Sequence, residues 1–227
     1  MKIQSEEVKI YFKNKAKEFD DIYENSGGLI KIISNKLFRT GMAERFDLTI
    51  KSCVDLKNKK KARDILDIGC GAGRFAFPLE RAGLSVYGID YSSEMIDLAN
   101  LYLKRYKQKI NRIPKIKFEV SDFIKDFDKK RHYDITLALG VFDYVKYPLF
   151  FIKKIKDITK KAIIMSFPKK ITPQMPIRKL WLLLRHCPVY FYTLNEVKKI
   201  LEQSKIKNYK IWEVSAGYQV LAYMSAN

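Results

Sequence analysis

The sequence contains few cysteines and no apolar segment long enough to cross a membrane. The three cysteines, Cys53, Cys70 and Cys187, do not fall in a spacing typical of a metal site or a disulfide framework. The apolar runs are shorter than the roughly 18–20 residues that a membrane span requires. The first residues also lack the apolar segment of a signal peptide. We therefore expect a cytoplasmic protein without a membrane span and without a metal site.

Acidic residues are also scarce, because 25 of them face 44 basic residues and the net charge is +19. Residues 98–118 hold seven basic side chains and no acidic one, and residues 150–210 hold fifteen basic and three acidic. Such an excess favours an anionic partner, which includes nucleic acid, an acidic peptide, and a carboxylated or phosphorylated metabolite. Lysine outnumbers arginine 34 to 10, however, so a compositional bias with solvated helix faces is an equally simple explanation.

A glycine-rich segment at residues 64–75 organises the rest of the chain. An apolar run ends in Asp67, glycines follow at positions 69, 71 and 73, and a helical pattern then begins. This order predicts a buried strand, a tight turn and the start of a helix. Glycine allows positive φ angles and lets a ligand approach the backbone. A dinucleotide-binding loop would place its third glycine one residue later.

Three further apolar runs follow, and each ends in a polar residue or in glycine. Residues 84–89 lead to Asp90, residues 116–120 lead to Asp122, and residues 133–139 lead to Gly140. Strands that alternate with helices predict an α/β fold with a parallel sheet covered on both faces. Ligands bind beyond the carboxyl ends of such strands, so these residues and the glycine loop should meet there.

The pattern Asp67-x-Gly69-x-Gly71-x-Gly73, followed by Asp90 and Asp122, resembles the class I (Rossmann-like) S-adenosylmethionine (SAM) methyltransferases. The resemblance implies a seven-stranded, mostly parallel sheet with helices on both faces, an antiparallel last strand pair and an N-terminal helical cap. It covers the whole chain as a single domain, with a cap at residues 1–60, a SAM-binding core at 61–227 and a substrate-side insertion at 168–193. It implies SAM as the cofactor and S-adenosylhomocysteine (SAH) as its product.

The resemblance also assigns cofactor contacts. Asp90 can accept hydrogen bonds from both ribose hydroxyls, Asp122 and Phe123 would contact adenine, and Arg45 would pair with the methionine carboxylate. For Tyr11 and Arg45, a packing or surface role remains the alternative. The complete predicted cofactor set is Tyr11, Arg45, Asp67, Gly69, Cys70, Gly71, Gly73, Asp90, Tyr91, Met95, Asp122, Phe123, Leu139 and Gly140.

The predicted catalytic residues are Asp143, Tyr144, Tyr23 and His186. SAM carries the reactive methyl group, so the protein mainly positions the acceptor. Asp143 would orient the acceptor or act as a base, although a solvated loop aspartate is an equal alternative, and His186 also fits a surface loop. The stretch after Gly140 lacks the Asn/Asp-Pro-Pro-Tyr/Phe motif that holds a flipped base. The paired-glutamate loop of protein-arginine methyltransferases is missing as well.

The nearest pattern within the family is that of the magnesium-protoporphyrin O-methyltransferases, which esterify a carboxylate. The shared features are Phe19-Asp20-x-Ile22-Tyr23, the Tyr after Asp143, Ser166-Phe167-Pro168 and Phe191-Tyr192-Thr193. Those enzymes have histidine at the position of Asp143, which argues for a different acceptor. We therefore expect O-methylation of an anionic acceptor, either a small metabolite or a peptide carboxylate, by a monomer or homodimer.

Two other functions remain open. An RNA-modifying methyltransferase is supported by charge alone, because the sequence shows no RNA-binding appendage. A SAM-binding module without catalysis would keep the glycines, Asp90 and Asp122 as well.

Local patterns give further expectations. A helix from about residue 29 should end near residue 54, with the basic cluster at residues 57–61 as a surface link to the first strand. Thr193 should cap a helix over residues 194–204, with Glu196 completing a capping box.

Overall fold

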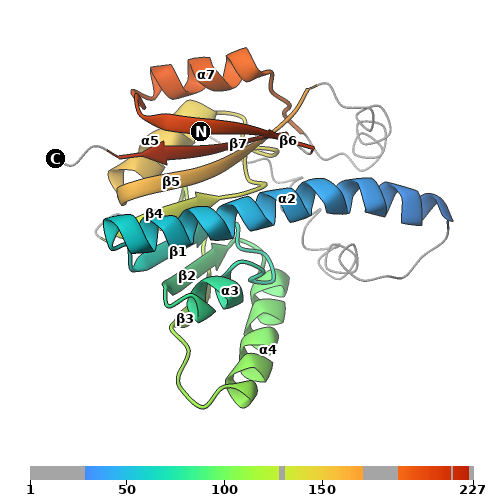
Figure 1. The fold of residues 1–227 in the computed structure, drawn as a ribbon, viewed down its shortest axis with the longest axis vertical. Helices are drawn as coiled ribbons and strands as arrows, with labels where there is room; N and C mark the ends of the chain where they lie inside the picture. The colour runs from blue at the N-terminus through green and yellow to red at the C-terminus, as the bar shows by residue number, and fades with distance from the viewer. Residues whose placement is uncertain (1–28, 128–130, 171–188, 216, 225–227) are drawn as a thin grey trace.

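The chain folds around one seven-stranded sheet covered by helices on both faces (Figure 1). The structure, a computed structural model, describes residues 29–127, 131–170, 189–215 and 217–224, with side chains from residue 42 onward. The strand order is β3-β2-β1-β4-β5-β7-β6, and β7 is antiparallel to both of its neighbours. The predicted Rossmann-like fold, with its antiparallel last strand pair, is confirmed.

In chain order, the elements are α2 (Leu29–Lys60), β1 (Asp64–Ile68), α3 (Ala76–Arg81), β2 (Ser85–Asp90), α4 (Ser93–Lys109), β3 (Ile116–Val120), β4 (Tyr133–Ala138), α5 (Pro148–Asp157), β5 (Thr159–Pro168), α7 (Leu194–Gln203), β6 (Tyr209–Val214) and β7 (Gly217–Tyr223).

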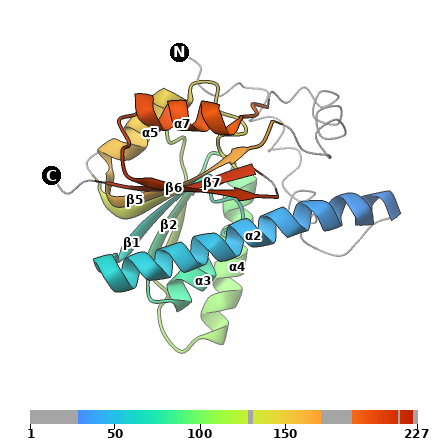
Figure 2. The ribbon, with the colours of Figure 1, turned by 45° about the horizontal axis from the view of Figure 1, so that its top comes forward.

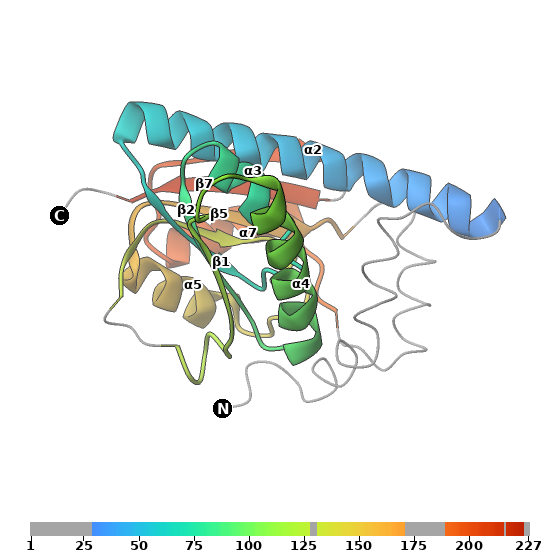
Figure 3. The ribbon, with the colours of Figure 1, turned by 90° about the horizontal axis from the view of Figure 1, so that it is seen from below.

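The helices form two layers, with α2, α3 and α4 on one face of the sheet and α5 and α7 on the other (Figures 1 and 3). Side chains alternate between the faces along each strand. Ile65 and Ile164 therefore join the core under α2, α3 and α4, whereas Leu66 and Ile163 join the core under α5 and α7. Both faces of the central strands are buried, which explains their continuous apolar runs.

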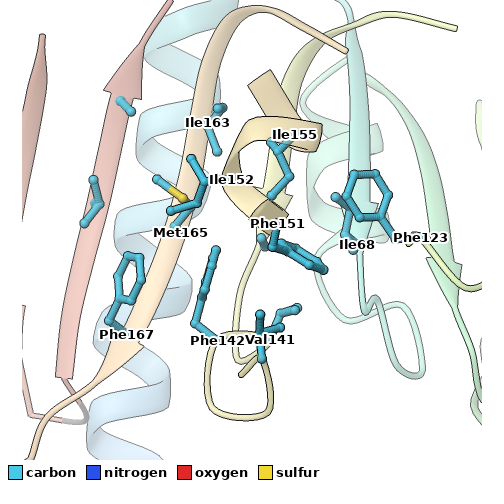
Figure 4. Packing of buried hydrophobic residues seen from close by; sticks show 14 of the residues in the cluster. Ile68, Phe123, Val141, Phe142, Phe151, Ile152, Ile155, Ile163, Met165 and Phe167 are labelled. Atoms are coloured by element: carbon cyan, nitrogen blue, oxygen red, sulfur yellow. The ribbon is translucent and has the colours of Figure 1, made fainter. Parts of the chain in front are cut away.

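Aromatic side chains fill the core on the α5 side, next to the carboxyl ends of β4 and β5. Phe142 stacks on Phe167 with ring centroids 4.5 Å apart, and Phe151 packs edge-on against Phe142 at 5.6 Å. Figure 4 shows Ile152 of α5 beside Met165 of β5 in the same cluster. This packing gives the loop after β4 a rigid support, since stacked rings resist repacking.

Helix α2 continues further than the sequence pattern predicts. Residues 57–60 are helical and do not form a surface link, so that expectation is wrong. Cys53 and Leu56 are buried against the sheet, and the Lys57 ammonium donates a hydrogen bond of 2.5 Å to the carbonyl oxygen of Ala82. The helix ends just before Lys61, whose φ is 50°. Lys57 thus anchors the last turn of α2 to the residue that follows α3.

Helix α2 is tied to the far edge of the sheet. The Gln219 amide donates to the Thr49 hydroxyl at 2.8 Å, and the Glu44 carboxylate accepts from both the backbone N–H and the hydroxyl of Ser215. In Figure 2 the N-terminal end of α2 extends past the edge of the sheet. Within the part of the chain that the structure describes, no helix is long and apolar enough to cross a membrane.

The capping box before α7 is confirmed. The Thr193 hydroxyl accepts from the backbone N–H of Glu196, and the Glu196 carboxylate accepts from the backbone N–H of Thr193. The antiparallel last strand pair that the resemblance implies is formed by β6 and β7.

Candidate active site

The loop between β1 and α3 has the conformation that its glycines predict. Gly69, Gly71 and Gly73 have φ angles of 69°, 53° and 81°. The backbone N–H groups of Gly69 and Cys70 both donate to the carbonyl oxygen of Ile89, at 2.8 and 3.0 Å. The loop is thus fixed to the end of β2. At Gly73 a Cβ atom would lie 2.4 Å from the Phe118 ring, so glycine is required there for packing as well.

Asp90, at the end of β2, holds this loop with its side chain. One carboxylate oxygen accepts from the backbone N–H of Gly71 at 2.9 Å, and the other accepts from that of Ser92 at 2.9 Å. Asp90 is only 9% exposed, so burial raises the pKa of its carboxyl, and these backbone N–H groups oppose the rise. The carboxyl group that the sequence assigns to the ribose therefore already orders the glycine loop.

Asp67 lies beside Asp90 and is buried more deeply. Burial, together with the nearby Asp90, raises the pKa of Asp67 to about 8. One of its side-chain oxygens, Oδ2, is buried without a hydrogen-bond partner among the described residues. The thiol of Cys70 is also buried, and its pKa is raised well above the usual value by burial and by both carboxyl groups. Cys70 therefore stays a neutral thiol and fills space in the loop.

Asp122 follows β3 and shapes a short turn. Its side-chain oxygen Oδ1 accepts from the backbone N–H groups of Ile124 and Lys125, at 3.0 and 3.3 Å. The backbone N–H of Ser121 donates to the carbonyl oxygen of Asp90 at 2.9 Å, which ties the turn to β2. Phe123 is 4% exposed and packs its ring against Phe151. The turn after β3 is therefore held in one position.

The loop after β4 is connected to α2 and β5 through Ser166. The Ser166 hydroxyl accepts from the backbone N–H of Gly140 at 2.8 Å and from the Arg45 guanidinium at 3.1 Å. Arg45 and Ser166 are 121 residues apart in the sequence. Arg45 thus lies at the carboxyl ends of β4 and β5, where the predicted cofactor residues gather.

The described part of the 168–193 segment lies against the loop after β4. The backbone N–H of Tyr190 donates to the carbonyl oxygen of Asp143 at 2.8 Å, and the Tyr192 hydroxyl donates to that of Phe142 at 3.3 Å. Asp143 is only 6% exposed, which removes the alternative of a solvated loop aspartate. Burial raises the pKa of the Tyr192 phenol, with a further rise from nearby Asp143.

Two glycines at this edge face open space. Among the described residues, apart from the adjacent ones in the chain, a Cβ atom added at Gly71 or at Gly140 would have no atom within 4 Å. Their φ angles are 53° and 72°, so both also adopt a backbone conformation that favours glycine. At Gly69, by contrast, a Cβ atom would meet Val141 at 2.9 Å. The carboxyl edge of the sheet therefore leaves room for a ligand directly above Gly71 and Gly140.

The chain is similar in sequence and in fold to known methyltransferases. Residues 66–161 match the family model of the methyltransferase domain. The magnesium protoporphyrin IX methyltransferase from Synechocystis PCC 6803, crystallised with bound SAH, has a similar structure with a TM-score of 0.73 and 21% identity. The similarity covers 96% of this chain and 98% of that one. Residues 66–161 thus resemble a methyltransferase domain, and the described chain has the Rossmann-like fold of that methyltransferase.

Curated relatives match a smaller region of this chain. A ubiquinone biosynthesis O-methyltransferase from Pelagibacter ubique is 37% identical over 110 residues, and one from Rickettsia conorii is 31% identical over 125 residues. These matches cover 48% and 49% of this chain. The chain spans 41% of the length of each of the two relatives.

The methyltransferase fold brings most of the predicted site residues to one edge. Of the other predicted residues, Met95 is buried in the first turn of α4, where its backbone N–H donates to the Ser92 hydroxyl. Tyr91 follows β2 and is partly exposed, Leu139 follows β4 and is partly buried, and Tyr144 lies in the loop after Gly140. Three predicted residues lie outside the described part of the chain, namely Tyr11, Tyr23 and His186.

Two residues near this edge of the sheet escaped the sequence interpretation. Ser166 was recognised only as part of a shared motif, and its bonds to Gly140 and Arg45 depend on contacts far apart in the sequence. Lys154 was counted as one of many basic residues, yet it is buried and donates to the carbonyl oxygens of Phe123 and Ile124. A lysine on the apolar face of a helix is a signal that could have identified it.

A separate pocket of about 360 Å³ opens at the opposite edge of the sheet, beside the amino-terminal ends of the parallel strands. Arg131 lies over the rings of Tyr87 and Tyr133 there, and Lys117 forms an ion pair with Glu119. Two of the charged residues that line this pocket, Lys117 and Arg131, therefore already have partners. Among the described residues, no group of three or more potential ligands could hold a metal ion.

Proposed function

We propose that this chain is a SAM-dependent O-methyltransferase that acts on a small anionic acceptor. The observation that carries the proposal is the open space above Gly71 and Gly140, at the edge where Asp67, Asp90 and Asp122 gather. The division into a cap at residues 1–60, a core and an insertion at 168–193 is part of the same proposal.

The residues at this edge suit the separate parts of SAM. A carboxylate offers about four acceptor positions, so Asp90 can bind Gly71 and Ser92 and still accept from the ribose hydroxyls. The unpartnered Oδ2 of Asp67 can accept from the ammonium group of the methionine part. Phe123 and the turn shaped by Asp122 would meet the adenine ring.

The Arg45 guanidinium is near enough to this edge to pair with the methionine carboxylate. In the structure, its guanidinium donates to the Ser166 hydroxyl at 3.1 Å. A guanidinium group has five N–H donors, so that bond leaves others available for a carboxylate. We therefore keep Arg45 as a proposed cofactor contact, held in place by Ser166 and by helix α2.

Oxygen as the methylated atom is supported by the names of the curated relatives, which are ubiquinone biosynthesis O-methyltransferases. An anionic acceptor is supported by the position of Lys169 and Lys170, which directly follow β5 at the carboxyl edge of the sheet and pair there with Glu213 and Glu196. Other lysines of the basic stretch 150–210 are engaged elsewhere. Lys154 is buried in the core, and Lys161 pairs with Asp134 at the opposite edge.

When bound, SAM supplies an electrophilic methyl group. The residues of this chain would orient the acceptor oxygen and exclude water around it. Correct orientation can supply about 7–11 kcal/mol of the activation barrier. Buried Asp143 and its neighbour Tyr144 lie just past Gly140, where an acceptor would approach the cofactor. Asp143 would orient a carboxylate acceptor, or hold the proton of a hydroxyl acceptor.

Calorimetry with SAH tests the cofactor part of the proposal. We expect the wild-type protein to bind SAH and Asp90→Ala to bind it at least tenfold more weakly, since ribose hydroxyls would lose a buried acceptor at about 1–3 kcal/mol. Asp97→Ala is the matched control, because Asp97 is an exposed carboxylate on α4. A wild-type protein that does not bind SAH would overturn the proposal.

Methyl transfer from radiolabelled SAM tests the acceptor. The panel contains aromatic and aliphatic carboxylates, catechols, an acidic peptide and RNA. We expect label in a small carboxylic acid. Label in RNA alone would support the RNA-modifying alternative, and SAH binding without transfer to any acceptor would support a binding module without catalysis.

A further inference from the structure

Helix α5 carries a buried lysine whose ammonium group points at the turn after β3. Lys154 is only 6% exposed. Its Nζ donates to the carbonyl oxygen of Phe123 and, at 2.9 Å, to that of Ile124. The same atom lies 4.9 Å from the centre of the Phe123 ring. A buried ammonium group is costly unless its N–H donors find acceptors, so these contacts define the position of Lys154.

The two carbonyl groups belong to consecutive peptide units, and Asp122 holds the other side of both units. The N–H of Ile124 and the N–H of Lys125 both donate to Oδ1 of Asp122. Each of the two units is therefore fixed at its N–H by Asp122 and at its C=O by Lys154. Rotation of either peptide plane would break a bond on each side, and one of them is a charge-assisted bond.

These peptide planes determine where the neighbouring side chains lie. Phe123 precedes the first of them, and its ring packs against Phe127 and Phe151 at 5.5 and 5.1 Å. Phe151 is on the same helix as Lys154, three residues earlier. Helix α5 thus holds the turn in two ways, by aromatic packing and by the lysine, although α5 itself lies on the face of the sheet and not at its edge.

We propose that Lys154 is a positioning residue for recognition of the adenine ring, acting through the turn formed by residues 122–125. The proposal rests on the proposed function, because it takes this turn as the place where the adenine of SAM binds. Lys154 does not touch the cofactor. Its contribution is to keep Asp122 and Phe123 in the arrangement that binds the base.

The test replaces the ammonium group and leaves a side chain of similar length. Lys154→Met should raise the dissociation constant of SAH at least tenfold. It should also reduce the preference for SAH over S-inosylhomocysteine, in which the amino group of the base is replaced by oxygen. A residue with a purely structural role would lower stability without changing this preference. At saturating SAM, kcat should stay within about threefold of wild type while KM for SAM rises, because the reacting atoms are untouched.

Lys156→Met is the matched control. Lys156 lies on the same helix and also donates to a backbone carbonyl, that of Ser204 at 2.5 Å, on the α7 side and away from the turn. It should bind SAH within twofold of wild type. Equal SAH affinity and equal base preference in Lys154→Met and Lys156→Met would overturn the proposal. Absence of SAH binding by the wild-type protein would instead overturn the proposed function.

If Lys154→Met does not fold, Lys154→Arg keeps the charge but changes the position of the donors. In that variant we expect the dissociation constant of SAH to rise at least threefold. We also expect amide hydrogen exchange to accelerate in the peptide that contains residues 122–127. Unchanged affinity together with unchanged exchange would equally overturn the proposal.

Discussion

The open space above Gly71 gives the sharpest test of where the ligand lies. Gly71→Ala adds one methyl group at a residue with a φ of 53°, and within the described part of the chain that methyl group meets no atom within 4 Å except those of the adjacent residues. Its cost to the free protein is therefore the cost of a left-handed backbone for a residue with a side chain, about 1–2 kcal/mol. For a protein of this length, such a loss corresponds to a decrease in Tm of roughly 2–8 °C.

Binding should suffer separately, because the methyl group would occupy the space that we assign to SAM. We expect SAH to bind at least tenfold more weakly to Gly71→Ala, a loss of about 1.4 kcal/mol or more. The larger side chain of Gly71→Val should abolish binding. Calorimetry with SAH measures the affinity, and thermal unfolding of the free protein measures the stability.

Gly83→Ala provides the matched control. Gly83 has a φ of 86° in the turn between α3 and β2, and an added Cβ would meet only the flexible end of Lys57, at 2.8 Å. Its stability should fall by a similar amount, while SAH affinity stays within twofold of wild type. If Gly71→Ala bound SAH as well as Gly83→Ala does, the space above the glycine loop would not be the cofactor site.

Three further predictions concern charge. The pKa of Asp67 is raised to about 8 in the folded protein, so its carboxyl group binds more protons in the folded state than in the unfolded state, and the free energy of unfolding should decrease as pH rises from about 4 to about 8. Asp67→Asn should remove this pH dependence, which denaturant titrations at several pH values measure. Parallel plots of unfolding free energy against pH for the two proteins would refute the assignment. For a carboxylate acceptor, Asp143→Asn should lower kcat less than about tenfold across pH, whereas a thousandfold loss would indicate a hydroxyl or amine acceptor that needs a base. Replacing Lys169 and Lys170 by glutamate should raise KM for the acceptor severalfold at low salt and much less at high salt. The same change at Lys160 and Lys161, at the opposite end of β5, is the control and should leave KM unchanged. Equal effects on KM in the two variants would mean that the attraction is not local to the site.

Much of the fold could be predicted because it depends on local requirements of the backbone. The three glycines after Asp67 adopt the positive φ angles that the turn needs, and apolar runs of five or six residues form the buried strands. Thr193 and Glu196 form their capping box within four residues of chain. The carboxyl ends of parallel strands lie at the same edge of a sheet, so the sequence alone predicted that Asp90 lies at this edge.

Other features were decided only when distant segments met. From the sequence, helix α2 is predicted to end near residue 54, because a run of lysines resembles a surface link. In the folded chain the helix continues to Lys60, and the Lys57 ammonium donates to the carbonyl oxygen of Ala82. Arg45 reaches Ser166 across 121 residues, and no local pattern encodes that bond. The raised pKa of Asp67 likewise comes from burial beside Asp90.

The lysines show most clearly what the sequence determines and what only the tertiary structure decides. The sequence determines how many lysines there are and that their charge favours anions. It does not separate Lys154, buried against the turn after β3, from Lys161 at the opposite edge or from Lys170 beside the acceptor region. A lysine side chain has the same chemistry at all three positions. Only the tertiary structure decides that Lys154 holds a backbone turn, whereas Lys161 and Lys170 pair with carboxylates at opposite edges of the sheet.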